Sequence, residues 1–247
     1  MPKAKYADIY KDLKRKIEIE EYEFQELLPS ENTLVLEYDC SRNTVRRAIA
    51  DLVTDGYVQT MQGKGVRVIY QPALHTTFTL GGIESFRESA IRNKQKSKTK
   101  VIHFVELTVD EKIAKKTGFN IGDEIYYLQR LHYLDDKALI LNHNYFLKSV
   151  AKGLTKEIAE KSIYDYLENT LGVNIVTSRR IMTVEKMTQI DEKYLELGDY
   201  NCMAVVSSNT FNSDGIMFEF TQSRHRPDYF TFQDNAIRKP NYFHSIV

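Results

Sequence analysis

The heptapeptide at residues 41–47, Ser-Arg-Asn-Thr-Val-Arg-Arg, constrains the fold of this 247-residue chain more than any other segment. Ser41 is a good helix N-cap, and the Asp55-Gly56 pair, with Gly where a left-handed conformation is preferred, ends the predicted helix. The apolar residues at helical spacing between these ends are Val45, Ala48, Ile49 and Leu52. The sequence therefore predicts a helix with one buried face and an N-terminal turn rich in arginine and small polar residues.

The flanking segments complete a small helical unit. An apolar stripe at three- and four-residue spacing predicts a first helix over residues 6–17, and Ser30, after Pro29, caps a short second helix. Two strand patterns at 57–61 and 66–70 enclose the hairpin tip Gln-Gly-Lys-Gly at 62–65. Three helices and a hairpin within 70 residues predict a winged helix-turn-helix domain at 1–70.

The chemistry of the third helix favours DNA as the partner. A helix N-terminus offers amide donors to phosphate, and arginine pairs with guanine in the major groove. Total charge does not predict this function, because 34 basic residues balance 34 acidic ones and residues 1–70 hold 11 basic and 12 acidic residues, a balance of −1. Three arginines alone are equally typical of any surface helix. The cap, the short preceding helix and the Gly-Lys-Gly hairpin tip together favour DNA binding.

Beyond a linker at 71–78, residues 79–247 alternate helix and strand patterns, which predicts an α+β domain on an antiparallel sheet. Hairpins are expected at 123–146, turned at Asp135-Asp136, and at 204–222, turned at Asp214-Gly215. Short helices are expected from Ser85, at 110–116 and at 162–171. The lysine-rich stretch 87–100 is expected to be a mobile, solvated surface segment.

Several classes of protein are disfavoured. No apolar run is long enough to cross a membrane, and the charged N-terminus lacks a signal-peptide core, so we expect a cytoplasmic protein. Cys40 and Cys202 are expected to be reduced thiols, and neither a metal site nor a cofactor is expected. No catalytic constellation has a recognisable spacing, so an enzyme is the less favoured alternative. His132 and His143 lie on the two strands of one predicted hairpin and could approach each other there, although a core or surface pair is the simpler interpretation.

The N-terminal motifs resemble those of GntR-type winged-helix regulators. The matching segments are Leu-Pro-Ser-Glu at 28–31, residues 41–48, Leu52, Gly-Tyr-Val at 56–58 and residues 62–65. The resemblance implies DNA contacts from the recognition helix and the wing, and Asn32 replaces an arginine that members often carry. The expected DNA-binding residues are Ser30, Ser41, Arg42, Asn43, Thr44, Arg46, Arg47, Gln62, Gly63 and Lys64.

The C-terminal motifs resemble the sensor domain of the HutC subgroup, which is similar in fold to chorismate lyase but binds ligands. They are Ser-Phe at 85–86, Gln-Arg at 129–130, residues 162–167 and residues 219–226. Within the subgroup the chain resembles bacterial trehalose-operon repressors, which implies trehalose 6-phosphate as effector, with glucosamine 6-phosphate as the alternative. The expected effector-binding residues are Ser85, Phe86, Arg130, His132, Asn142, Tyr166, Glu219 and Ser223.

The role of these effector residues is expected as follows. The phosphate would lie at the helix start at Ser85 and Phe86, with Arg130 nearby. His132 and Asn142 stand where the family often has an arginine and an acid.

A two-fold operator requires a two-fold protein, so we expect a repressor that forms a homodimer through residues 79–247. A constitutive architectural DNA binder would not need so large a second domain.

Overall fold

The computed structural model describes residues 5–71, 77–79 and 82–233. These residues form two compact units, divided between residues 74 and 75. The expected linker lies mostly outside the described residues, and Thr77 and Phe78 from its end belong to a short strand, so the domain limits remain a prediction. The described helices are not long and apolar enough to span a membrane.

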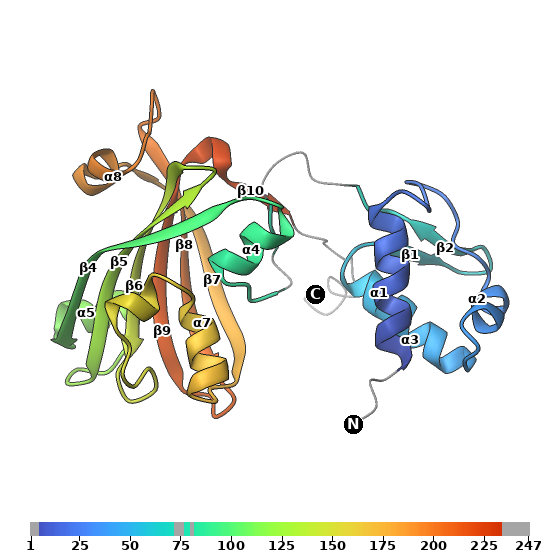
Figure 1. The fold of residues 1–247 in the computed structure, drawn as a ribbon, viewed down its shortest axis with the longest axis horizontal. Helices are drawn as coiled ribbons and strands as arrows, with labels where there is room; N and C mark the ends of the chain where they lie inside the picture. Colours follow the sequence, from blue (N-terminus) through green and yellow to red (C-terminus); the bar gives the residue numbers. More distant parts are fainter. Residues whose placement is uncertain (1–4, 72–76, 80–81, 234–247) are drawn as a thin grey trace, which may run out of the picture. The chain divides into compact units, whose positions relative to one another are not determined.

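The N-terminal unit consists of three helices and a two-stranded hairpin (Figure 1). Its elements are α1 (Lys5–Glu18), α2 (Glu31–Glu37), α3 (Arg42–Thr54), β1 (Val58–Met61) and β2 (Gly65–Val68). The predicted caps are confirmed: the Ser30 hydroxyl accepts from the Thr33 amide, and the Ser41 hydroxyl accepts from the Thr44 amide. The predicted stripes of α1 and α3 pack into one core around Leu13, Leu34 and Leu52.

The C-terminal unit is built on a six-stranded antiparallel sheet in the order β4-β5-β6-β9-β8-β7 (Figure 1). Its strands are β4 (Ser97–Thr108), β5 (Glu124–Leu134), β6 (Lys137–Leu147), β7 (Ile175–Lys186), β8 (Cys202–Asn212) and β9 (Met217–His225). The sheet thus consists of two three-stranded meanders, β4-β5-β6 and β7-β8-β9. They meet where β6 pairs with β9, from Ile140 opposite His225 to Phe146 opposite Glu219.

Short helices cover both faces of this sheet. One face carries α4 (Phe86–Arg92), α6 (Lys156–Ala159), α7 (Ile163–Asp165) and the π-helical turn η1 (Tyr166–Thr170). The other carries α5 (Glu111–Thr117) and α8 (Gln189–Tyr194). After β9, the 3₁₀ turn η2 (Pro227–Tyr229) leads to β10 (Thr231–Gln233), which pairs in parallel with β3 (Thr77–Thr79).

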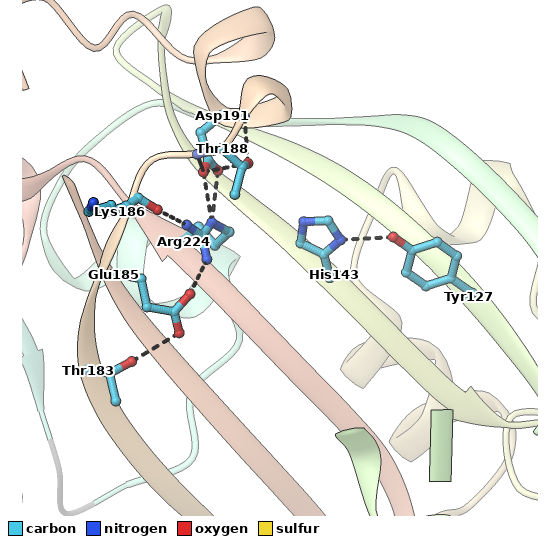
Figure 2. A network of polar contacts seen from close by, with 8 residues as sticks. All are labelled: Tyr127, His143, Thr183, Glu185, Lys186, Thr188, Asp191 and Arg224. Carbon is cyan, nitrogen blue, oxygen red and sulfur yellow. Dashed lines mark hydrogen bonds and ion pairs between the residues drawn. The ribbon is translucent and has the colours of Figure 1, made fainter. Parts of the chain in front are cut away.

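A buried ion pair fastens α8 to the sheet (Figure 2). The Arg224 guanidinium of β9 donates to both carboxylate oxygens of Asp191, to Glu185 on β7 and to the Lys186 carbonyl oxygen. Asp191 in turn accepts from the backbone and hydroxyl of Thr188, the N-cap of α8. One side chain of β9 therefore holds both β7 and the helix α8 that follows it.

One expectation about the fold was wrong. The stretch 87–100, expected to be a mobile surface segment, forms most of α4 and the start of β4. Ser89 and Ala90 of α4 are buried, and Ala90 packs with Leu134 and Leu139. The exposed Lys98 and Lys100 belong to β4, an edge strand that pairs with only one neighbouring strand.

Candidate functional site

Helix α3 presents its first turn to solvent. Arg42, Asn43, Arg46 and Arg47 are exposed, whereas the apolar residues between them point into the core. Because Val45 and the other apolar residues recur at helical spacing, they share one face, and the basic residues lie on the opposite face of the helix. The side chains of Ser30 and Ser41 are exposed as well, but each hydroxyl is used as a helix cap.

The three arginines of α3 differ in their surroundings. Arg46 donates to both carboxylate oxygens of Glu31 at 3.0 and 3.1 Å, and Arg47 lies 3.8 Å from the ring centroid of Tyr6 and donates to its hydroxyl. Within the described residues, Arg42 has neither a hydrogen bond nor an ion pair. Arg42 is thus the arginine most available to an external phosphate or base.

Several acids of the N-terminal unit are engaged in internal contacts. Asp12 accepts from the Tyr38 hydroxyl and pairs with Arg15 and Lys16, and Glu37 pairs with Lys16. The Tyr57 hydroxyl donates to Glu18 at 2.7 Å. These pairs explain how a unit without net positive charge still exposes an arginine-rich helix start.

The hairpin tip supplies a second exposed region. Gln62, Gly63 and Lys64 are exposed, and Gly63 and Gly65 have positive φ values of 70° and 105°. Nothing lies within 4 Å of a Cβ built on either glycine. The glycines therefore serve the backbone conformation of the turn, and the Lys64 ammonium is free to approach a phosphate.

A cavity of about 180 Å³ lies in the C-terminal unit between one face of the sheet and the helices α4 and α7. Seven of the eight expected effector residues line it: Ser85, Phe86, Arg130, His132, Asn142, Glu219 and Ser223. They come from α4 and its cap and from β5, β6 and β9, so strands far apart in sequence converge here. Four basic side chains, Arg87, Arg130, Lys161 and Arg180, face only two acidic ones, Glu84 and Glu219, in the lining.

A hydrogen-bonded chain crosses the cavity floor. Arg130 donates from Nε to Asn144 at 2.8 Å, and Asn144 donates to the Thr221 hydroxyl at 2.7 Å. Glu219 accepts from Thr221 at 2.7 Å and from the Tyr164 hydroxyl at 2.6 Å. The register of β6 and β9, with Asn144 opposite Thr221, puts these groups on one face of the sheet.

The electrostatics of this floor favour an anionic ligand. Burial lowers the pKa of Arg130 to about 10, although Glu219 acts in the opposite direction. No carboxylate among the described residues lies within ion-pair distance of Arg130, whose Nη1 donates only to the Ala159 carbonyl oxygen. Burial and the adjacent Glu219 raise the pKa of Tyr164 well above its usual range, so its hydroxyl stays a donor.

The structure differs from two expectations about the effector site. Tyr166 does not line it, because its hydroxyl donates to the Lys152 carbonyl oxygen; Tyr164 lines it instead. Two positions along a helical turn are about 200° apart, so only one of the two tyrosines can face the sheet. The Ser85 hydroxyl and amide are both engaged with Glu88, so a carboxylate already occupies the helix start where the phosphate was expected.

The sequence did not predict four further lining residues. Asn144 and Thr221 face the cavity because each is two residues along a strand from an expected residue, and side chains alternate along a strand. Ser178 and Arg180 lie on β7, a strand that was not predicted from the sequence. The alternation also separates His132, in the cavity, from His143, which contacts the Tyr127 hydroxyl at 2.8 Å on the other face.

Two polar atoms in the cavity lack a partner among the described residues: Nε2 of His132 and Oδ1 of Asn142. The side chains are buried, with 1% and 8% of their residue surface exposed. Thr99 contacts the other ring nitrogen of His132 at 2.9 Å. Buried polar atoms without partners are uncommon, and here both belong to the cavity wall.

Comparisons with known proteins identify both domains. Residues 5–68 match the model of the gntR family of bacterial regulatory proteins, and residues 92–231 match the UTRA domain. The chain is 37% identical over 234 residues to the HTH-type transcriptional regulator TreR of Bacillus subtilis, covering 95% of this chain and 98% of that protein.

Solved structures show the same arrangement of elements. The possible transcriptional regulator YydK from Bacillus subtilis, 22% identical, superposes with a TM-score of 0.80 over 94% of this chain and 99% of its own. The effector-binding domain of the Bacillus subtilis trehalose repressor, 37% identical, covers 57% of this chain and 99% of its own with a TM-score of 0.52. The chain belongs to the gntR family of bacterial regulatory proteins, as a transcriptional regulator with a UTRA domain and not an enzyme.

Proposed function

We propose that this chain is a repressor that releases operator DNA when trehalose 6-phosphate enters the cavity of its C-terminal domain. As a member of the family it is a DNA-binding regulator with an effector-binding domain. The identity of the effector, the individual DNA contacts, a cytoplasmic location and dimerisation are the parts that we add. They are supported by the exposed arginines of α3, the charge of the cavity and the relatives described above.

Operator recognition is assigned to α3 and the hairpin tip. Arg42 and Asn43 contact base edges or phosphates from the start of the helix, and Lys64 contacts the backbone from the wing. Arg46 reaches DNA with its guanidinium oriented by Glu31, and Arg47 lies beside α1 near the phosphates. Two copies of the chain read a two-fold operator as a homodimer joined through the C-terminal domain.

The effector assignment depends on one observation: Arg130 lines the cavity, half-buried, without a carboxylate partner among the described residues. A half-buried guanidinium gains from a charge-assisted, bidentate contact with a phosphate. Lys161 follows closely on Ala159, whose carbonyl accepts from Arg130, and Lys161 also lines the cavity. We therefore assign the phosphate to Arg130 and Lys161 instead of the capped helix start at Ser85.

The sugar rings occupy the remainder of the cavity. Glu219, held by Tyr164 and Thr221, accepts hydroxyl donors from the ligand, and Phe86 packs against a ring. Release of DNA requires that the ligand bind the arrangement that is incompetent for DNA more tightly, because equal affinity for both arrangements shifts nothing.

Calorimetry on the full chain tests the effector. Trehalose 6-phosphate should bind at least tenfold more tightly than free trehalose, because only the phosphate makes charge-assisted bonds to Arg130. Arg130→Gln should remove that preference, whereas Arg179→Gln, an exposed arginine outside the cavity lining, should keep it. The ligand that binds most tightly should also release operator DNA in a gel-shift titration.

Three results would change the proposal. Equal binding of free trehalose and the phosphorylated sugar would refute the phosphate site. Tighter binding of glucosamine 6-phosphate would refute the trehalose assignment but not the sensor. Binding without any effect on operator affinity would refute the regulatory role of the cavity.

A further inference from the structure

Two cavity residues have polar atoms that the described residues leave without a partner. Nε2 of His132 and Oδ1 of Asn142 are both inaccessible to solvent, and both side chains are more than nine-tenths buried. Leaving such atoms unpaired costs stability, so their retention on a cavity wall points to a ligand group. Such a ligand needs a group that can hydrogen-bond both to an imidazole nitrogen and to a carboxamide oxygen.

The two residues lie together on the cavity floor. Asn142 on β6 is opposite Arg130 on one side and Ser223 on the other, and His132 is two residues along β5 from Arg130. The Arg130 side chain reaches away from them, toward Asn144 and the Ala159 carbonyl. The cavity therefore has a neutral end beside its cationic end.

Apolar side chains surround the neutral end. The Phe86 ring lies against the imidazole of His132, with ring centroids 4.3 Å apart. Ile140, opposite His132, and Val206, opposite Ser223, also line the cavity. Apolar walls around a few neutral polar groups match the carbon skeleton and hydroxyls of a sugar ring.

Charge does not favour an anion at the His132 end of the cavity. Burial, together with Arg130 and His225, lowers the pKa of His132 well below its usual range, so the ring is neutral. Thr99 engages one ring nitrogen, and the other is left as either a donor or an acceptor according to the tautomer. A phosphate oxygen only accepts and cannot satisfy the carboxamide oxygen of Asn142. A hydroxyl donates and accepts, so it satisfies both residues.

We propose that His132, Asn142 and Ser223 form a hydroxyl-binding subsite for the unphosphorylated ring of a disaccharide phosphate. This assignment rests on the effector site proposed above and specifies which part of the ligand each end of the cavity binds. The subsite selects for a second, uncharged ring, and Arg130 selects for the phosphate. A monosaccharide phosphate anchored at Arg130 leaves the subsite unfilled.

Calorimetry with the full chain and two ligands tests this division. Asn142→Leu should weaken trehalose 6-phosphate binding by roughly tenfold, the loss expected for a neutral hydrogen bond in a buried site. Glucose 6-phosphate, which lacks the second ring, should lose less than about twofold. His132→Phe should show the same ligand dependence, and Arg130→Gln should weaken both ligands.

Thermal unfolding of the ligand-free chain gives an independent test, with Asn144 as the matched control. Asn144 is two residues along the same strand and face, but it accepts from Arg130 and donates to Thr221. Asn142→Leu should leave Tm unchanged or raise it, because it removes an unpaired polar group. Asn144→Leu should lower Tm by about 3 °C or more, because it leaves two partners unsatisfied.

Each outcome has a defined meaning. If wild-type chain binds trehalose 6-phosphate but Asn142→Leu binds it equally well, the hydroxyl subsite is wrong and the proposed effector stands. If both ligands weaken equally in Asn142→Leu, or if that variant lowers Tm as much as Asn144→Leu, Asn142 has a structural role and the subsite is refuted. If wild-type chain binds no sugar, phosphorylated or free, both the effector and the subsite are refuted.

Discussion

Nε of Arg224 lies 2.9 Å from both carboxylate oxygens of Asp191, and the two side chains are only 4% and 0% exposed. Asp191→Ala should destabilise the C-terminal domain by about 3–5 kcal/mol, because it leaves a buried guanidinium without its main counter-charge. Urea unfolding followed by fluorescence or circular dichroism measures the effect. Asp228→Ala is the control, since it removes the partner of the more exposed Arg226 and should cost about 1 kcal/mol or less.

The recognition helix gives the second prediction. Arg42→Ala should lower operator affinity by roughly ten- to a hundredfold, because a base or phosphate contact contributes about 1–3 kcal/mol. The fold should be unaffected, since Arg42 is exposed and has no partner among the described residues. Arg15→Ala on α1 should bind operator like wild type in the same gel-shift titration. Wild-type affinity in Arg42→Ala would contradict the assignment.

Salt dependence gives the third prediction. Residues 1–70 carry 11 basic and 12 acidic residues, so DNA affinity has to come from a few focused contacts. The slope of log affinity against log salt should be much closer to zero than the roughly −10 of a heavily basic repressor. Fluorescence anisotropy at several salt concentrations measures it. A steep slope would mean that another basic surface, such as the lysines of β4, also contacts DNA.

Assembly gives the fourth prediction. Residues 79–247 expressed alone should sediment as a dimer, because a symmetric operator reader needs its contact between copies outside the DNA-binding domain. Analytical ultracentrifugation over a range of concentrations measures the mass. A monomer at concentrations where the full chain is dimeric would move the contact to the N-terminal domain.

The buried histidines give the fifth prediction. Burial lowers the pKa of His143 to about 4 and that of His225 to about 3, and His132 shifts in the same direction. The unfolded chain therefore binds more protons than the folded chain below about pH 6.5, the ordinary histidine value. Stability should be complete above this pH and fall as the pH decreases toward 4. Each histidine contributes at most about 1.4 kcal/mol per pH unit.

A single variant separates this effect from general acid denaturation. His143→Asn should reduce the loss of Tm between pH 6.5 and 4.5, because it removes one group that must stay neutral in the folded state. An unchanged pH dependence in His143→Asn would show that His143 does not contribute to it.

Short sequence signals were sufficient to predict helix ends and hairpin turns. Ser41 caps α3, Gly118 ends α5 with φ 87°, and Asp135 and Asp136 turn the β5–β6 hairpin with positive φ. Each of these residues acts within a few positions of itself, so its effect can be predicted without tertiary information.

The failures involve contacts that only the tertiary structure creates. The lysines between residues 94 and 100 outweighed the few buried residues of α4, so a helix and an edge strand were interpreted as a mobile segment. Tyr164 and Tyr166 cannot be distinguished without knowing which face of the turn meets the sheet. His132 and His143 are eleven residues apart on a hairpin, and only the pairing register, His132 with Ile140 and His143 with Gln129, separates them.

The meeting of two meanders at β6 and β9 has a consequence for how the domain acquires its ligand affinity. Arg130 and Asn144 belong to the first meander, and Thr221 and Glu219 belong to the second. Each meander is joined by local connections, whereas the β6–β9 pairing joins residues far apart in the chain and is the slower kind of contact to form. The cavity floor therefore needs both meanders, and a chain still being synthesised cannot complete it until β9 has been made.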